Sequence, residues 1–111
     1  MKNFYAISNH IFDLRLDSYE LHIYSYLVCR AGKRGECWPS IATIARQTGV
    51  SENTVIKKID SLVSKRLIDK RTTSQKTPSG KVRQANNHYY IRPFEEAYEH
   101  YFDFGSGVKS D

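Results

Sequence analysis

The stretch WPSIATIARQTGVSENTVIKKIDSLVSKRLIDKR, from Trp38 to Arg71, decides the fold of this chain. Ser40 stands just before an apolar-periodic run, where its hydroxyl can accept a hydrogen bond from the first backbone N–H groups of a helix. Gly49 can end that helix in the left-handed conformation, which glycine adopts at little cost. Ser51 can cap a second helix in the same way. The stretch therefore predicts two short helices joined by a glycine turn.

Both predicted helices carry one apolar face. In the first helix, the residues Ile41, Ile44 and Ala45 recur at helical spacing. In the second helix, the spacing predicts a buried stripe made of Val55, Ile59, Leu62 and Val63. At about 100° per residue, the opposite face holds polar residues, namely Asn53, Lys57, Ser61 and Ser64, flanked by Thr54 and Lys58. Donors and cations of this kind suit the base edges and phosphates of a major groove.

Two strand-forming segments follow the second helix. Leu67 and Ile68 lead into the basic run DKR, and Asn87–Arg92 is again rich in strand formers. The gap between them, 74–86, contains the turn signal Pro-Ser-Gly and three cations, which are Lys76, Lys81 and Arg83. A capped helical hairpin alone is common, but two strands around a basic loop directly after it are not. The sequence predicts a mainly α fold with a small β-wing and an extra C-terminal helix.

This order of elements resembles the winged helix-turn-helix superfamily. It is similar to the small helix-turn-helix domains of phage and plasmid replication proteins and of mobile-element regulators of Gram-positive bacteria. The residues that carry the resemblance are Ser18-Tyr19-Glu20-Leu21, Cys37-Trp38-Pro39-Ser40, Ile44-Ala45, Thr48-Gly49-Val50-Ser51, Thr54-Val55 and Leu67-Ile68. The resemblance covers roughly residues 4 to 92 and implies binding to double-stranded DNA. It does not indicate which biological process is served.

The remaining segments complete one domain of ordinary size. Ser18 is expected to cap the first main helix, and Gly32 is expected to end it. Cys37-Trp38 is a candidate for a short strand that pairs with the wing, and Trp38 is interpreted as a core anchor. We expect a winged helix DNA-binding domain over 1–92, a C-terminal helix of the same domain over 93–104, and a flexible tail over 105–111.

The predicted C-terminal helix is aromatic on one side and acidic on the rest. Its aromatic side holds Phe94, Tyr98, Tyr101 and Phe102, and its acids are Glu95, Glu96, Glu99 and Asp103. Acids do not favour a surface that meets DNA. The helix either packs on its own domain or pairs with a second copy to form a homodimer, and the sequence leaves both alternatives open.

The positive charge of the chain is concentrated in the predicted reading helix and wing. The net charge is +5, but residues 40–92 hold eleven Lys and Arg against three acids, a net +8. Residues 93–111 hold five acids against Lys109, a net −4. Excess cations on the second helix and the wing are what phosphate neutralisation needs, so the favoured partner is double-stranded DNA.

Several other classes of protein are disfavoured by the sequence. No apolar run approaches the length of a membrane span, and the first ten residues lack the apolar stretch of a secretion signal, so a cytoplasmic location is expected. Two cysteines and scattered histidines do not form a metal motif. No catalytic constellation, phosphate-cradling glycine loop, cofactor motif or small-molecule pocket signature is present, so an enzyme is not expected.

Two functions remain. The first is a sequence-specific DNA-binding protein that acts as a transcriptional regulator, or as an origin-binding accessory factor of a plasmid, phage or conjugative element. The residues expected to read bases are Asn53, Thr54, Lys57 and Ser61. The residues expected to contact the DNA backbone are Ser40, Thr43, Ser51, Lys58, Arg71, Lys76, Lys81 and Arg83. The alternative is a winged-helix adaptor that binds a replication or DNA-transfer protein through its aromatic C-terminal helix.

Overall fold

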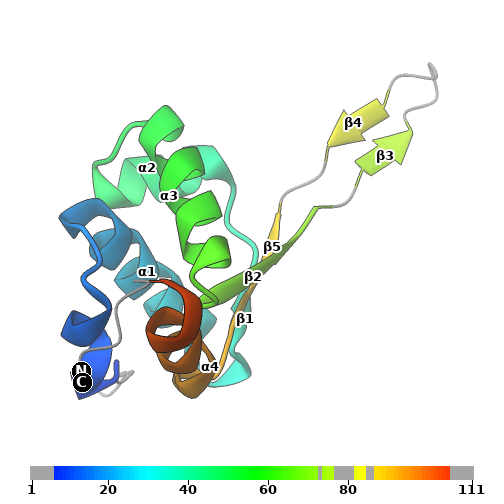
Figure 1. Ribbon diagram of the computed structural model, residues 1–111. Coiled ribbons are helices and arrows are strands. Elements are labelled where there is room, and N and C mark those ends of the chain that lie inside the picture. The colour runs from blue at the N-terminus through cyan, green and yellow to red at the C-terminus, as the bar shows by residue number, and fades with distance from the viewer. Residues whose placement is uncertain (1–6, 73, 77–81, 85–86, 106–111) are drawn as a thin grey trace.

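Three α-helices form the body of the protein (Figure 1). The computed structural model describes residues 7–72, 74–76, 82–84 and 87–105. A 3-10 helix, η1 (Asn9–Leu14), precedes α1 (Ser18–Ala31), and a single 3-10 turn, η2 (Gly32–Arg34), follows it. The two short helices α2 (Ile41–Thr48) and α3 (Glu52–Ser64) come next, with the glycine turn between them as the sequence predicts.

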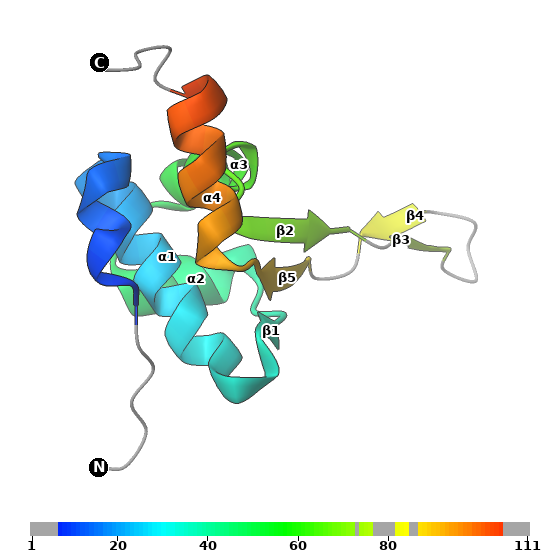
Figure 2. The same ribbon diagram turned by 60° about the horizontal axis from the view of Figure 1, so that its bottom comes forward.

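A small antiparallel sheet lies against these helices and extends into a hairpin. The strands β1 (Glu36–Cys37), β5 (His88–Ile91) and β2 (Ile68–Arg71) pair in the order β1-β5-β2. Beyond them, β3 (Ser74–Lys76) and β4 (Val82–Gln84) pair with each other. Figures 1 and 2 both show this hairpin projecting away from the body as a wing. Together with the C-terminal helix described below, the elements form the predicted winged helix-turn-helix.

The core lies between the three helices and the inner face of the sheet. Leu27, Ile44, Val55 and Leu62 have no exposed surface, and Tyr89 of β5 is equally buried. The predicted stripe on the second helix is therefore confirmed at Val55, Ile59 and Leu62, while Val63 is half-buried at its edge. Every main element contributes to this one apolar cluster, and burial of such side chains is the dominant favourable term in folding.

Trp38 does not anchor the core, contrary to the sequence interpretation. The strand pairs Cys37 with Tyr89, and both side chains face inward with at most 5% of their surface exposed. Because successive side chains of an extended chain point to opposite faces, Trp38 is turned outward and is 48% exposed. The predicted strand at Cys37-Trp38 exists, but it lies one residue earlier, at Glu36–Cys37.

The C-terminal helix α4 (Phe94–His100) continues into a π-helical turn, η3 (Tyr101–Gly105). Ala97 is fully buried, and Phe94, Tyr98 and Tyr101 are half-buried against the core. Phe102 remains 40% exposed. Most of the aromatic side therefore packs on its own domain. Gly105, the first residue of the predicted tail, still belongs to η3, and residues 106–111 lie outside the described residues.

No helix in the described ranges is both long and apolar enough to cross a bilayer.

Candidate nucleic-acid interface

The turn between α2 and α3 has the geometry that the sequence predicts. Gly49 adopts φ 75° and ψ 15°, and its N–H donates to the Ala45 carbonyl at 2.9 Å. Apart from its two chain neighbours, no described residue comes within 4 Å of the place where a Cβ would stand, so the need for glycine comes from the backbone conformation and not from crowding. Val50, directly after the turn, is buried, which fixes the direction in which α3 leaves it.

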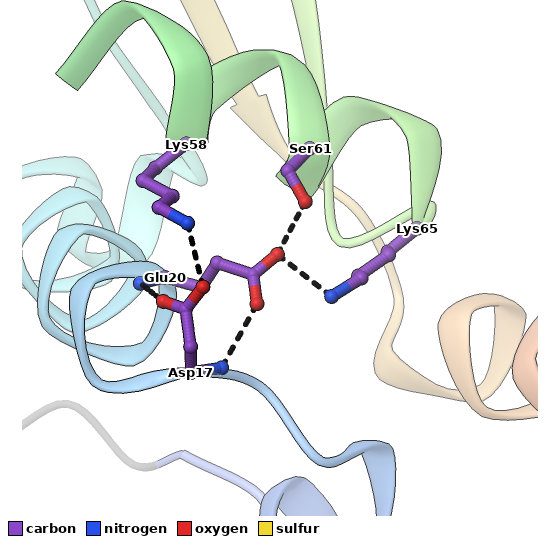
Figure 3. A network of polar contacts seen from close by, with 5 residues as sticks. All are labelled: Asp17, Glu20, Lys58, Ser61 and Lys65. Carbon is purple, nitrogen blue, oxygen red and sulfur yellow. Dashed lines mark hydrogen bonds and ion pairs between the residues drawn. The ribbon is translucent and has the colours of Figure 1, made fainter. Parts of the chain in front are cut away.

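A buried carboxylate joins α1 to α3 (Figure 3). Glu20 is only 3% exposed, and its Oε2 accepts hydrogen bonds from the Ser61 hydroxyl and from Lys65 Nζ, the latter at 2.7 Å. Its Oε1 accepts from the Asp17 backbone N–H at 2.9 Å. Every oxygen of this carboxylate is therefore satisfied, as a buried charge requires. The contacts hold the C-terminal half of α3 against the N-terminus of α1.

Asp17, and not Ser18 as the sequence predicts, caps α1. Its carboxylate accepts from the Glu20 N–H at 2.8 Å while Glu20 bonds the Asp17 N–H in return, which makes a reciprocal capping box. The second oxygen of Asp17 pairs with Lys58 Nζ at 2.6 Å. Partial burial works to raise the pKa of Asp17, but the hydrogen bonds from Lys58 and from the Glu20 N–H outweigh it and lower the pKa.

The same balance acts on Glu20. Burial raises its pKa, but the hydrogen bonds from Lys65, from Ser61 and from the Asp17 N–H together overcome that effect, and the pKa falls below its ordinary value of 4.5. Glu20 is thus held as a carboxylate in the folded protein. Its contribution to stability is complete above pH 4.5 and is lost as the pH falls through the lowered pKa.

This network engages two of the residues that the sequence predicts to contact DNA. The sequence predicts that Ser61 reads bases and that Lys58 holds a phosphate, but both side chains turn toward α1. The flank of α3 that carries Lys58, Ser61 and Lys65 is the one that α1 covers. Hydrophobic periodicity places these residues beside the buried stripe, but it cannot say which flank the neighbouring helix will cover.

The solvent face of α3 holds the other expected readers. Asn53 and Lys57 are exposed in its first two turns, and Thr54 is half-buried beside them. Sequence reasoning missed two exposed neighbours, which are Glu52 and Ile56, the latter 45% exposed. The sequence does contain a signal for Ile56, because it is an apolar residue on the otherwise polar face of the predicted helix. These residues lie in the N-terminal half of α3, whereas Ser64 and Lys65 at its other end line a cavity together with Ala97 and His100 of α4.

The N-terminal ends of α2 and α3 carry the same capping arrangement. The Ser40 hydroxyl accepts from the Thr43 N–H at 3.0 Å and donates to the Thr43 hydroxyl at 2.9 Å. Ser51 does the same toward Thr54, at 3.3 Å and 2.9 Å. In each pair the threonine oxygen is the acceptor, so its own hydrogen remains available to a further acceptor. Both hydroxyls stand at the positive end of a helix dipole.

The base of the wing is braced by side chains on the outer face of the sheet. The rings of Trp38 and His88 are 5.1 Å apart, and those of His88 and Tyr90 stack at 4.5 Å with an interplanar angle of 6°. The guanidinium of Arg71 lies 5.5 Å from the centre of the Tyr90 ring. Thr72 donates to Asn87 at 2.7 Å across the two chain segments that lead into the hairpin.

Arg71 is exposed at the point where the wing leaves the sheet. Lys76 and Arg83 lie on β3 and β4, for which the strand positions are described but not the side chains, and Lys81 lies outside the described residues. Arg46 of α2 is an exposed cation to which sequence reasoning assigned no role. Of the described side chains expected to contact DNA, Asn53 and Lys57 lie on the solvent face of α3, the serine and threonine hydroxyls lie at the N-termini of α2 and α3, and Arg71 lies where the wing begins.

Comparisons with known proteins agree with this architecture. Residues 14–68 match the model of a family described as a helix-turn-helix domain. A search of curated proteins found no match. The solved structure of a "Possible transcriptional regulator from Methanosarcina mazei Go1" is similar, with a TM-score of 0.54 and 13% sequence identity. The alignment covers 88% of this chain and 82% of that chain, and at this identity it shows a shared fold.

The Glu20 network should be a main source of stability. Glu20→Gln removes the charge that Lys65 and Ser61 contact, so we expect the free energy of unfolding at pH 7 to fall by about 1.5–3 kcal/mol. The gap between variant and wild type should close as the pH falls below 4.5, where wild-type Glu20 becomes protonated. Urea denaturation over a range of pH measures both effects.

Glu99→Gln is the matched control, because Glu99 is exposed on α4. It should change stability by no more than about 0.5 kcal/mol. A Glu20→Gln variant that is as stable as this control would show that the network orients α3 without stabilising the fold.

Proposed function

We propose that this protein is a DNA-binding regulator that inserts the N-terminal half of α3 into the major groove of double-stranded DNA. The observation that carries the proposal is the exposed set Asn53, Ile56 and Lys57 in the first two turns of α3, the helix whose C-terminal end is held against α1 by Glu20. The helix-turn-helix match over 14–68 supports it, as does the likeness in fold to a possible transcriptional regulator. This mode of docking is the usual one for the fold.

Each exposed residue of this end offers a different kind of base contact. Asn53 can pair with adenine through two hydrogen bonds, and Lys57 can donate to guanine. Ile56 adds an apolar surface for a thymine methyl group, and Glu52 can accept from the amino group of cytosine. Thr54, whose hydroxyl hydrogen is available, can reach either a base edge or a phosphate. A surface of this composition favours sequence-specific binding.

Phosphate contacts are expected on both sides of this face. The capping pairs Ser40–Thr43 and Ser51–Thr54 bring hydroxyl and backbone N–H donors to the positive ends of α2 and α3. Arg71 and the wing cations Lys76, Lys81 and Arg83 would neutralise phosphates beyond the end of α3. Arg46 is added to the phosphate contacts. We no longer propose a phosphate contact for Lys58 or base reading by Ser61, because the carboxylates of Asp17 and Glu20 engage these two side chains.

We further propose that the regulator serves a plasmid, phage or conjugative element, as a transcription factor or an origin-binding accessory protein. This part rests on the likeness of the sequence to replication-associated helix-turn-helix domains. The adaptor alternative has less support, because Phe94, Tyr98 and Tyr101 pack on the core of their own domain and so offer less surface to a replication or transfer protein.

The reading role of α3 can be tested by substitution. Asn53→Ala or Lys57→Ala should each weaken binding to the true site by about 1–3 kcal/mol and affect random DNA much less. The site would first be selected from a random duplex library, and affinities measured by fluorescence anisotropy at fixed salt. Lys33→Ala is the control for Lys57→Ala, since it removes the same charge from an exposed turn in η2. Equal affinities for both Lys variants would assign reading to another surface.

The wing should supply affinity that does not depend on sequence. Replacing Lys76, Lys81 and Arg83 by alanine should weaken binding to specific and random duplexes alike, since charges at the wing meet phosphates. The slope of log K against log salt should shrink by roughly 0.9 for each phosphate that the wing no longer neutralises. Affinity measured over a series of salt concentrations gives this slope. An unchanged slope in the triple variant would place these cations away from DNA.

We also propose that the regulator forms a symmetric homodimer through α4. Phe102 is 40% exposed, and its ring lies 4.7 Å from that of Tyr98 at an angle of 45°. The Tyr98 ring in turn contacts His10 of η1 edge-on. Sedimentation at micromolar concentration should show a dimer, and Phe102→Ser should shift it toward monomer. Dimers of this fold place half-sites about 10–10.5 base pairs apart. A wild-type monomer that binds one isolated half-site would show that the aromatic residues serve only their own domain.

A further inference from the structure

A cavity lies at the end of α3 opposite to the proposed reading face. It has a volume of about 370 Å³ and forms where η1, the C-terminal end of α3 and α4 meet. Leu14, Ala97 and Tyr101 form its apolar wall, and its polar groups come from Arg15, Ser64, Lys65 and His100. The volume falls in the range of roughly 300–1,000 Å³ that small-ligand pockets occupy. The cavity can therefore hold a small organic molecule and not only an ion.

The polar part of this cavity is cationic. Arg15 and Lys65 both line it, and among the described residues no Asp or Glu does so. The acids Glu96, Glu99 and Asp103 line a neighbouring hollow with Arg66, and His100 is the residue that both hollows share. Two basic side chains next to an apolar wall fit a ligand that carries one anionic group on an apolar body, because a carboxylate is bound strongly by such cations.

Arg15 is the side chain best placed to receive that anion. Within the described part of the chain, its side chain takes part in no hydrogen bond or ion pair. Its backbone adopts φ 54° and ψ 44° where η1 ends, and its N–H donates to the Phe12 carbonyl at 3.2 Å. This left-handed conformation is uncommon for arginine, and residues held in such conformations gather at functional sites.

Lys65 links the cavity to α3. Lys65 lines the cavity, and its Nζ donates to Glu20 Oε2 at 2.7 Å. An anion in the cavity would compete with Glu20 for Lys65, and Glu20 would then keep only Ser61 and the Asp17 N–H as partners. Since these contacts fix α3 against α1, occupancy of the cavity would loosen the helix whose other end faces DNA.

We propose that this cavity binds a small organic carboxylate with an apolar body, and that the bound ligand lowers the affinity of the protein for DNA. The proposal that the cavity binds a carboxylate rests only on the cavity and its cations. The effect on DNA rests on the function proposed above. The two parts are tested separately, so that failure of one can be told from failure of the other.

Binding is tested by adding benzoate, as the probe, to the DNA-free full chain and recording two-dimensional amide NMR spectra. Benzoate should shift the signals of Arg15, Ser64, Lys65 and His100 in a saturable way. Its neutral isostere benzamide and the charge-only acetate should bind at least tenfold more weakly. Equal binding of benzamide would overturn the anion preference, and equal binding of acetate would overturn the need for an apolar body.

The variant Arg15→Asn tests the site without unfolding the turn, because asparagine tolerates the left-handed conformation. Arg15→Asn should lower the affinity for benzoate at least tenfold. Lys33→Asn, which removes a distant charge, should leave that affinity unchanged. Benzoate that shifts signals elsewhere, or that binds Arg15→Asn as well as wild type, would refute the site.

The second part compares DNA affinity with and without saturating benzoate. Wild type should lose at least threefold in affinity, and Arg15→Asn should not respond. Benzoate that occupies the cavity but leaves DNA affinity unchanged would refute the coupling and leave the site intact. A protein that binds no duplex at all would refute the proposed function and not the cavity.

Discussion

The carboxylate of Glu20 is the interaction on which the placement of α3 depends. It completes the capping box that begins α1 and, with its other oxygen, receives Ser61 and Lys65 from α3. Apolar packing alone would press these helices together, but it is not directional and would allow α3 to rotate or slide. A buried carboxylate with all its partners in place has few alternatives of equal energy, because each displaced partner would leave a charge unsatisfied.

One consequence is that the two ends of α3 have different tasks. The C-terminal end is tied to α1 through Glu20, and it lines a cavity together with residues of α4. The N-terminal end carries the exposed Asn53, Ile56 and Lys57, and its cap leaves a threonine hydroxyl available. The acids of α4 belong to the side of the domain where the C-terminal end of α3 lies, so they do not repel DNA phosphates at the N-terminal end of α3.

The sequence predicted the elements well, because their signals are local. Ser40, Gly49 and Ser51 mark helix ends by their own backbone chemistry, and Val55, Ile59 and Leu62 mark the buried stripe by their spacing. The sequence predicted less well the orientation of side chains whose partners are distant in the sequence. Lys58 and Ser61 turn toward α1, which covers one flank of α3 and not the other. Trp38 faces outward because the pairing of Cys37 with Tyr89 sets the strand register.

The N-cap of α1 shows a second reason why the sequence alone can mislead. Asp17 and Ser18 are both good capping residues, and the choice between them depends on Glu20, which stands three residues after Asp17 and bonds back to it. Of the candidate site, the residues at the free end of α3 could be found from periodicity and chemistry. The cavity beside Lys65 could not, because its walls come from three segments that only the folded chain brings together.

The most direct test of DNA binding through the free end of α3 is an amide NMR titration of the full chain with a mixed-sequence DNA duplex of about two helical turns at low salt. We predict that shifts and line broadening concentrate on residues 40–43, 51–57 and 71–72, with the wing also affected and the exposed face of α4 unchanged. Perturbations centred on α4, or a chain that shows none as duplex is added in excess, would contradict this placement of the interface.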